Sequence, residues 1–258
     1  MKKLLGLCLP PCVATPCAAT LCAATLLACG PGASDPPPVQ GADAGAADAR
    51  ALDAAPQAKE AGPPPERFVT EVVSFTPGEC AGFGIPSMPG VVLGPPRGAG
   101  ALFGGTDVVS LGERGEVVLG FAPWSIVDQD GPDFIVFENA FWAGGKPDAP
   151  FADPGEVSVS DDGVDWRTFP CTATQPPFGA CSGWHPVYSS PENGISPFDP
   201  AVAGGDAYDL ADVGLTRARF VRIRDTGLEK CPSDPSLRTT NVGYDLDAVS
   251  VVHGQRAN

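Results

Sequence analysis

The 258-residue sequence has little of what builds long helices, metal centres or nucleic-acid surfaces. It has only 2 His, so a centre made of several histidines is not expected. Its 16 basic residues stand against 31 acidic ones, which excludes a general nucleic-acid binder, because phosphates need clustered Lys and Arg. With 32 Gly and 30 Pro, the longest stretch beyond residue 66 without either is 215–226. Long helices are therefore excluded there, and short strands joined by turns remain.

The N-terminal sequence has the pattern of a targeting segment. Lys2 and Lys3 precede an apolar stretch that ends in Leu26-Leu27-Ala28-Cys29. This ending resembles the lipobox of bacterial lipoproteins, and the resemblance implies a signal peptide over 1–28 and a lipid on Cys29. It also implies a place at the outer membrane or cell surface. An ordinary signal peptide and a single membrane anchor stay open as alternatives, although prolines interrupt the apolar stretch.

Two regions follow the signal. Residues 29–66 are rich in Ala and Pro and contain no aromatic residue, so they bury too little apolar surface to offset the entropy of ordering. We expect a flexible spacer there. Residues 67–258 are expected to form one folded domain.

Four cysteines remain for the folded domain, namely Cys80, Cys171, Cys181 and Cys231. An even number in an exported protein predicts two disulfides, with three possible pairings. The short loop between Cys171 and Cys181 favours that pair, which leaves Cys80 to Cys231. A zinc site is the rival interpretation, but no Cys-x-x-Cys spacing occurs.

Strand patterns fill the domain. They are predicted at 69–75, 107–111, 116–121, 133–137, 156–160, 164–169, 218–224 and 244–252. The second and third flank a Gly-Glu-Arg-Gly turn and predict a hairpin. The run at 133–137 is almost wholly apolar, which is typical of a strand covered on both faces. So many strands predict an all-β, two-sheet sandwich or jelly roll, with 172–207 as a long loop that is functional or held by a disulfide.

Two pairs of motifs carry resemblances. Residues 157–166 (VSVSDDGVDW) and 218–223 (ARFVRI) resemble strands of discoidin-like, galactose-binding-like jelly rolls. That resemblance implies a module that binds sugars or lipids through loops at one end, although no loop here matches a known binding loop. Residues 133–141 (DFIVFENAF) and 243–249 (GYDLDAV) resemble a group of bacterial cell-surface proteins. This second resemblance implies location more than activity.

One acidic loop predicts a metal site. Asp128, Asp130 and Asp133 lie within six residues that include Gly and Pro, and Glu138 and Asn139 follow. Hard oxygen ligands on a backbone that can curl are what Ca²⁺ needs. The alternative is a solvated acidic turn that caps the next strand.

A second acidic pair lies in the last predicted strand. Asp245 and Asp247 are two residues apart, so their side chains are expected on one face, about 7 Å apart. The valines at 249 and 251 would continue that face into the core. Buried carboxylates need partners. Either a cation or an ion-pair ladder with Arg222 and Arg224 supplies them, and the ladder is slightly favoured.

Exposed aromatic residues are the usual platforms for sugars. Trp142 precedes Ala-Gly-Gly, and Trp184 lies in the long loop. Either can stack on a sugar ring or fill a gap beneath a loop. Asp209 and Asp212 are expected to cap a short helical turn.

The sequence lacks the GxSxG, HExxH, P-loop and GxGxxG motifs, so no enzyme is predicted. We expect a lipid-anchored cell-surface module that binds a glycan, with Ca²⁺ as structural support. It would touch the membrane only through its lipid. One alternative is a structural or assembly protein of the cell envelope that contacts other proteins. A less favoured one is a carbohydrate hydrolase, which needs only two carboxylates.

Overall fold

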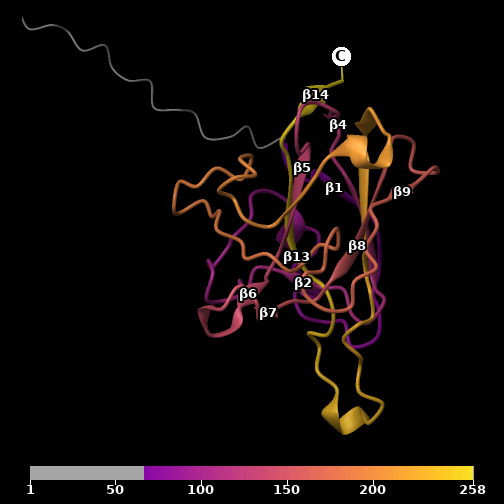
Figure 1. Ribbon diagram of the computed structural model, residues 1–258. Coiled ribbons are helices and arrows are strands. Elements are labelled where there is room, and N and C mark those ends of the chain that lie inside the picture. Colours follow the sequence, from indigo (N-terminus) through magenta and orange to yellow (C-terminus); the bar gives the residue numbers. More distant parts are fainter. Residues whose placement is uncertain (1–66, 258) are drawn as a thin grey trace, which may run out of the picture. The chain divides into compact units, whose positions relative to one another are not determined.

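The structure is a computed structural model that describes residues 67–257 (Figure 1). The predicted signal peptide (1–28), spacer (29–66) and lipid on Cys29 lie outside the described residues. Within 67–257 there is no α-helix, and no helix there is long and apolar enough to cross a membrane. The 3₁₀ helices are η2 (Ile85–Ser87), η3 (Gly90–Val92), η4 (Ala143–Gly145), η5 (Leu210–Val213) and η6 (Pro235–Leu237).

The larger sheet has five antiparallel strands in the order β1-β3-β12-β8-β9. They are β1 (Glu71–Thr76), β3 (Glu116–Gly120), β12 (Phe220–Asp225), β8 (Gly155–Ser160) and β9 (Arg167–Thr168). β8 and β9 form a hairpin. Asp162 Oδ1 holds its turn by accepting the N–H groups of Val164 and Asp165, both at 2.8 Å.

A second antiparallel sheet has four strands in the order β10-β5-β13-β2. They are β10 (Asp206–Tyr208), β5 (Phe134–Glu138), β13 (Asp245–Val251) and β2 (Val109–Ser110). Two smaller sheets are β11 (Arg217–Ala218), β4 (Trp124–Val127) and β14 (Gly254–Arg256), and the pair β6 (Phe141–Trp142) and β7 (Pro150–Phe151). The predicted all-β class is therefore confirmed.

One apolar core receives side chains from both large sheets. Alternate residues of each strand point into it, because side chains of a strand leave on opposite faces in turn. The five-stranded sheet contributes Val117, Leu119, Val157, Val159, Val221 and Ile223. The four-stranded sheet contributes Val109, Phe134, Val136, Leu246, Val249 and Val251.

β5 is covered on both faces, as its continuous apolar run predicts. All five of its residues are buried. Ile135 and Phe137 point away from the main core and pack with Val187 and Ala203 of the long 172–207 segment. That segment therefore forms a cover over the outer face of β5, which explains why so long a loop lies in a small domain.

The predicted hairpin between 107–111 and 116–121 is wrong. β2 pairs with β13, whereas β3 pairs with β1 and β12, so the turn passes from one sheet to the other. Other segments hold this turn. Glu113 bridges to Glu79, and Arg114 N–H donates to Asp225 Oδ1 at 2.8 Å. These partners come from distant parts of the chain, which a local turn motif does not reveal.

The four cysteines form two disulfides, Cys80–Cys231 and Cys171–Cys181. This is the pairing that the sequence favours. The first joins residues 151 apart in the sequence and the second residues 10 apart. The short one holds the beginning of the long segment that covers β5.

Serine replacement of each cysteine pair should separate the two contributions. The chain-entropy model gives about 5 kcal/mol for a separation of 151 and about 3 kcal/mol for one of 10. Cys80→Ser with Cys231→Ser should therefore lower the free energy of unfolding by about 2 kcal/mol more than Cys171→Ser with Cys181→Ser. Urea unfolding measures both. An equal loss, or a larger loss from the short loop, would contradict the expectation.

Candidate functional site

A fully buried carboxylate stands at the beginning of β5. Asp133 is 0% exposed. Its Oδ1 accepts the N–H of Gln129 at 3.0 Å and a hydrogen bond from His253 Nδ1 at 2.9 Å, and its Oδ2 accepts Leu210 N–H at 2.8 Å. One side chain thereby ties together the acidic loop, the beginning of η5 and the turn after β13.

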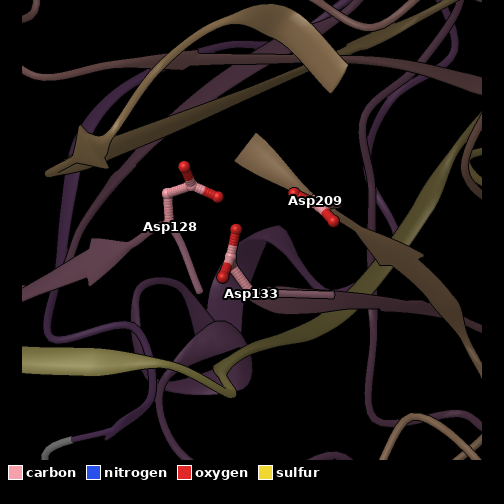
Figure 2. Close-up of side chains that lie close together, drawn as sticks. All are labelled: Asp128, Asp133 and Asp209. Atoms are coloured by element: carbon pink, nitrogen blue, oxygen red, sulfur yellow. The ribbon is translucent and has the colours of Figure 1, made fainter. Parts of the chain in front are cut away.

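Asp133 also belongs to an acidic triad. Oxygens of Asp128, Asp133 and Asp209 lie within 4.8 Å of one another. Figure 2 shows the carboxylates of Asp128 and Asp133 turned toward each other, with Asp209 beside them. Asp209 is also the N-cap of η5, where its Oδ1 accepts Ala211 N–H at 2.9 Å, as expected from the sequence. The triad can hold a metal ion.

The triad differs from the predicted calcium loop. Asp130 is exposed and is not one of the three. Glu138 and Asn139 lie at the far end of β5, and a strand advances about 3.3 Å per residue, so Glu138 is roughly 16 Å from Asp133. The third carboxylate is instead Asp209, because β10 pairs with β5 and brings η5 beside the loop.

Replacement of Asp133 by asparagine tests its role as a buried acceptor. The amide keeps one acceptor oxygen and sets an NH₂ against donors that are already in place. We expect the free energy of unfolding to fall by about 2–4 kcal/mol. Asp130→Asn, on the exposed side of the same loop, is the matched control and should change it by less than about 0.5 kcal/mol. Similar losses for both variants in urea unfolding would refute the proposed role.

A second carboxylate cluster lies where β5 ends and β13 begins. Asp245 N–H donates to Glu138 Oε1 at 3.3 Å, and Asn139 Nδ2 donates to Asp245 Oδ2 at 3.1 Å. Ser110 Oγ also donates to Asp245 Oδ1. Glu138 is 1% exposed, and its Oε2 is buried without a hydrogen-bond partner among the described residues.

Burial, and after it the charges of neighbouring carboxylates, raise the pKa values of this cluster. Burial first, and then the charges of Asp245 and Asp153, hold the pKa of Glu138 well above its usual range. Burial and the charges of Glu229, Asp245 and Asp225 raise the pKa of Asp153 to about 7. Burial is also the main cause that raises the pKa of Asp245 to about 6, with the charge of Glu229 adding to it.

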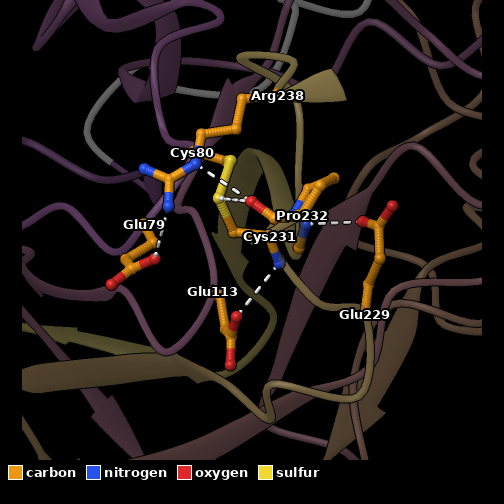
Figure 3. The surroundings of a disulfide bond; sticks show 8 residues. Glu79, Cys80, Glu113, Glu229, Cys231, Pro232 and Arg238 are labelled. Carbon is orange, nitrogen blue, oxygen red and sulfur yellow. Dashed lines mark hydrogen bonds and ion pairs between the residues drawn. A yellow bond between two sulfur atoms is a disulfide. The ribbon is translucent and has the colours of Figure 1, made fainter. Parts of the chain in front are cut away.

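The carboxylate beside the Cys80–Cys231 disulfide has a basic partner, unlike the carboxylates of the buried cluster. Figure 3 shows Glu113 beside it, where its Oε2 accepts Cys231 N–H at 3.0 Å. Lys230 Nζ donates to Glu113 Oε1 at 2.9 Å, and this bond lowers the pKa of Glu113. Glu229 accepts Gly243 N–H at 2.8 Å and adds its charge to that of the buried cluster. The basic group therefore pairs with the outer carboxylate and not with the cluster.

The predicted ion-pair ladder of Asp245 and Asp247 with two arginines is wrong. Arg222 and Arg224 lie on β12 of the other large sheet. Arg224 Nη2 lies 2.6 Å from Glu116 Oε2, and the guanidinium of Arg222 lies 4.5 Å above the Trp166 ring. The ladder fails because the two strands, although both strong in the sequence, are not neighbours.

Val249 and Val251 face the main core, as the sequence predicts, but Asp247 does not share their face. The pairing of β13 with β5 shifts between Leu246 and Ala248, which leaves Asp247 as the extra residue of a β-bulge. Leu246 and Val249 therefore both face the main core. Asp247 accepts Arg97 N–H at 2.9 Å, and burial raises its pKa to about 8.

A pocket of about 400 Å³ lies between β10 and the long segment. Its lining includes Trp142, His185, Tyr188, Asp206 and Tyr208. His185 Nδ1 lies 2.6 Å from Asp206 Oδ1, and Asp206 Oδ2 accepts Gly183 N–H at 2.7 Å. The pocket thus sets aromatic rings beside a fixed pair of hydrogen-bonding groups.

The two tryptophans predicted as sugar platforms have different places. Trp142 lines the pocket and is half-buried. Trp184 is not among the lining residues and packs against His185, with the two ring centroids 3.7 Å apart. The sequence did not single out Asp206, whose role depends on the pairing of β10 with β5, or Asp153, which precedes β8 without a motif of its own.

No protein-family model matches the chain, and no curated protein matches it significantly. The resemblances to discoidin-like jelly rolls and to bacterial cell-surface proteins therefore stay predictions. The pocket and the buried carboxylates are therefore the features from which a function is inferred.

Proposed function

We propose that the described domain is a sugar-binding module of the cell envelope and that the pocket beside Trp142 is its binding site. The observation that carries this proposal is the combination of the Trp142 ring with the fixed His185–Asp206 pair in one pocket. An aromatic face packs against the C–H groups of a sugar, while a carboxylate and an imidazole bond its hydroxyls. A volume of about 400 Å³ falls within the range of small-ligand sites.

The site is held ready by its backbone contacts. Asp206 accepts from Gly183 N–H and bonds to His185, so the imidazole is oriented before a ligand arrives. The ring of Trp184 packs against the imidazole of His185. Binding then costs little ordering of these side chains, which favours affinity for a small polar ligand.

The location agrees with an exported protein. Two disulfides indicate an oxidising, extracytoplasmic compartment. Within that compartment we propose attachment through a lipid on Cys29 to the outer membrane or cell surface. We further propose that the two large sheets form a galactose-binding-like jelly roll and that Ca²⁺ is the ion of the Asp128–Asp133–Asp209 triad, whose ligand atoms are all hard oxygens.

A glycan array followed by calorimetry tests the sugar site. Trp142→Ala should weaken binding of the best glycan at least about tenfold, because truncation removes a ring from the pocket. Trp166→Ala is the matched control, since Trp166 packs against Arg222 and does not line the pocket. It should leave the affinity within about twofold. Silence across the array, or equal losses in both variants, would contradict the proposal.

Contact with another envelope protein is the second candidate, and exposed apolar side chains favour it. Leu102, Phe103 and Phe151 are 55%, 69% and 53% exposed. Their segments meet at the β6–β7 pair, where Trp142 N–H donates to Ala101 O at 2.8 Å. Large exposed apolar residues are typical of interaction surfaces. A stoichiometric partner that is lost with Phe103→Ser and kept with Trp142→Ala would favour this function over sugar binding.

A further inference from the structure

Among the buried carboxylates of residues 67–257, only Glu138 has a fully buried oxygen without a hydrogen-bond partner. Asp133 and Asp225 each have both oxygens bonded, and Asp225 accepts the N–H groups of Arg114, Gly227 and Tyr244 at 2.7–3.0 Å. Glu138 Oε1 accepts Asp245 N–H, but its Oε2 is buried and unpartnered. A buried carboxylate oxygen without a partner destabilises the folded state substantially. Something that the described residues do not supply must compensate it.

The neighbouring charged groups do not compensate it. Glu138 feels the charges of Asp245 and Asp153, and Asp153 in turn feels Glu229, Asp245 and Asp225. Every one of these neighbours is a carboxylate. Protonation would neutralise Glu138, but it would leave the charges of Asp245 and Asp153 facing each other. A cation would bind the free Oε2 of Glu138, and it would also offset the repulsion among the carboxylates.

We propose that Glu138, Asp153 and Asp245 hold a Ca²⁺ ion where β5 ends and β8 and β13 begin. The side chains around the ion offer carboxylate and amide oxygens and no sulfur or imidazole, which suits Ca²⁺ better than zinc. Unlike the triad, these three carboxylates do not all have oxygens within 4.8 Å of one another. Water molecules therefore complete the coordination, and Ca²⁺ accepts them among its six to eight ligands.

The position of the site gives the ion a structural task. Glu138 and Asp245 belong to the four-stranded sheet, and Asp153 lies two residues before β8 of the five-stranded sheet. An ion shared among them ties the two large sheets together at one end. Asp153 is only partly buried, so the ion can reach the site from solvent. The site is separate from the sugar pocket and from the triad, and it does not depend on sugar binding.

Calcium titration of the purified chain after chelator treatment tests the proposal. The Asp128→Asn variant is used as the background, because it disables the triad and leaves the proposed site intact. In this background Ca²⁺ at about 100 times its Kd should raise the melting temperature by about 5 °C or more. Adding Glu138→Gln, which keeps the shape and removes the charge, should abolish this shift and weaken calorimetric Ca²⁺ binding at least about tenfold.

Two results would overturn the proposal. The first is a calcium response that is the same with and without Glu138→Gln. The second is no calcium response in the Asp128→Asn background. A Glu138→Gln variant that is more stable than its parent would then identify Glu138 as a buried protonated acid.

Asp153→Asn provides a variant that does not depend on a fully buried position. Because Asp153 is partly exposed, the change should leave the melting temperature in chelator within about 2 °C and lower the Ca²⁺ affinity about tenfold. Unchanged affinity in the Asp128→Asn background would overturn the assignment, even if Glu138→Gln fails to fold.

Discussion

Backbone N–H groups in a loop-rich β protein need acceptors, and buried carboxylates at strand ends supply them here. Asp133 serves the beginning of β5, Asp206 the beginning of β10 and Asp225 the end of β12. Each accepts donors from segments far apart in the sequence. Residues 67–257 contain no α-helix, so many loop N–H groups have no partner in regular secondary structure. These carboxylates accept hydrogen bonds from such groups instead. The rest of the structure depends on this constraint.

The same constraint shapes both candidate sites. Asp206 fixes the loop that carries His185, so a structural carboxylate also forms one wall of the pocket. At the far end of β5, Glu138 and Asp245 stand at strand ends in the same manner, but one oxygen of Glu138 is left over. The acidic composition therefore has two uses. Most buried carboxylates bind backbone donors, and one cluster is the proposed cation site.

Local patterns in the sequence predict a large part of the fold. The apolar run of β5 and the strand at β8 each depend on residues within a few positions, and both are found. Strand partners depend on the whole chain. For that reason the sequence could not show that Asp209 joins Asp128, or that Asp247 forms a bulge. The cysteine pairing was within reach because four cysteines allow only three pairings.

The unpartnered oxygen of Glu138 is the proposed ligand for a cation, and a crystal structure of the protein grown in Ca²⁺ can show the ion itself. We expect an ion 2.3–2.6 Å from Glu138 Oε2, the usual Ca²⁺–oxygen distance, with Asp153 or its water molecules completing the coordination. A structure with the triad occupied and Glu138 Oε2 bonded only to a protein donor would contradict it.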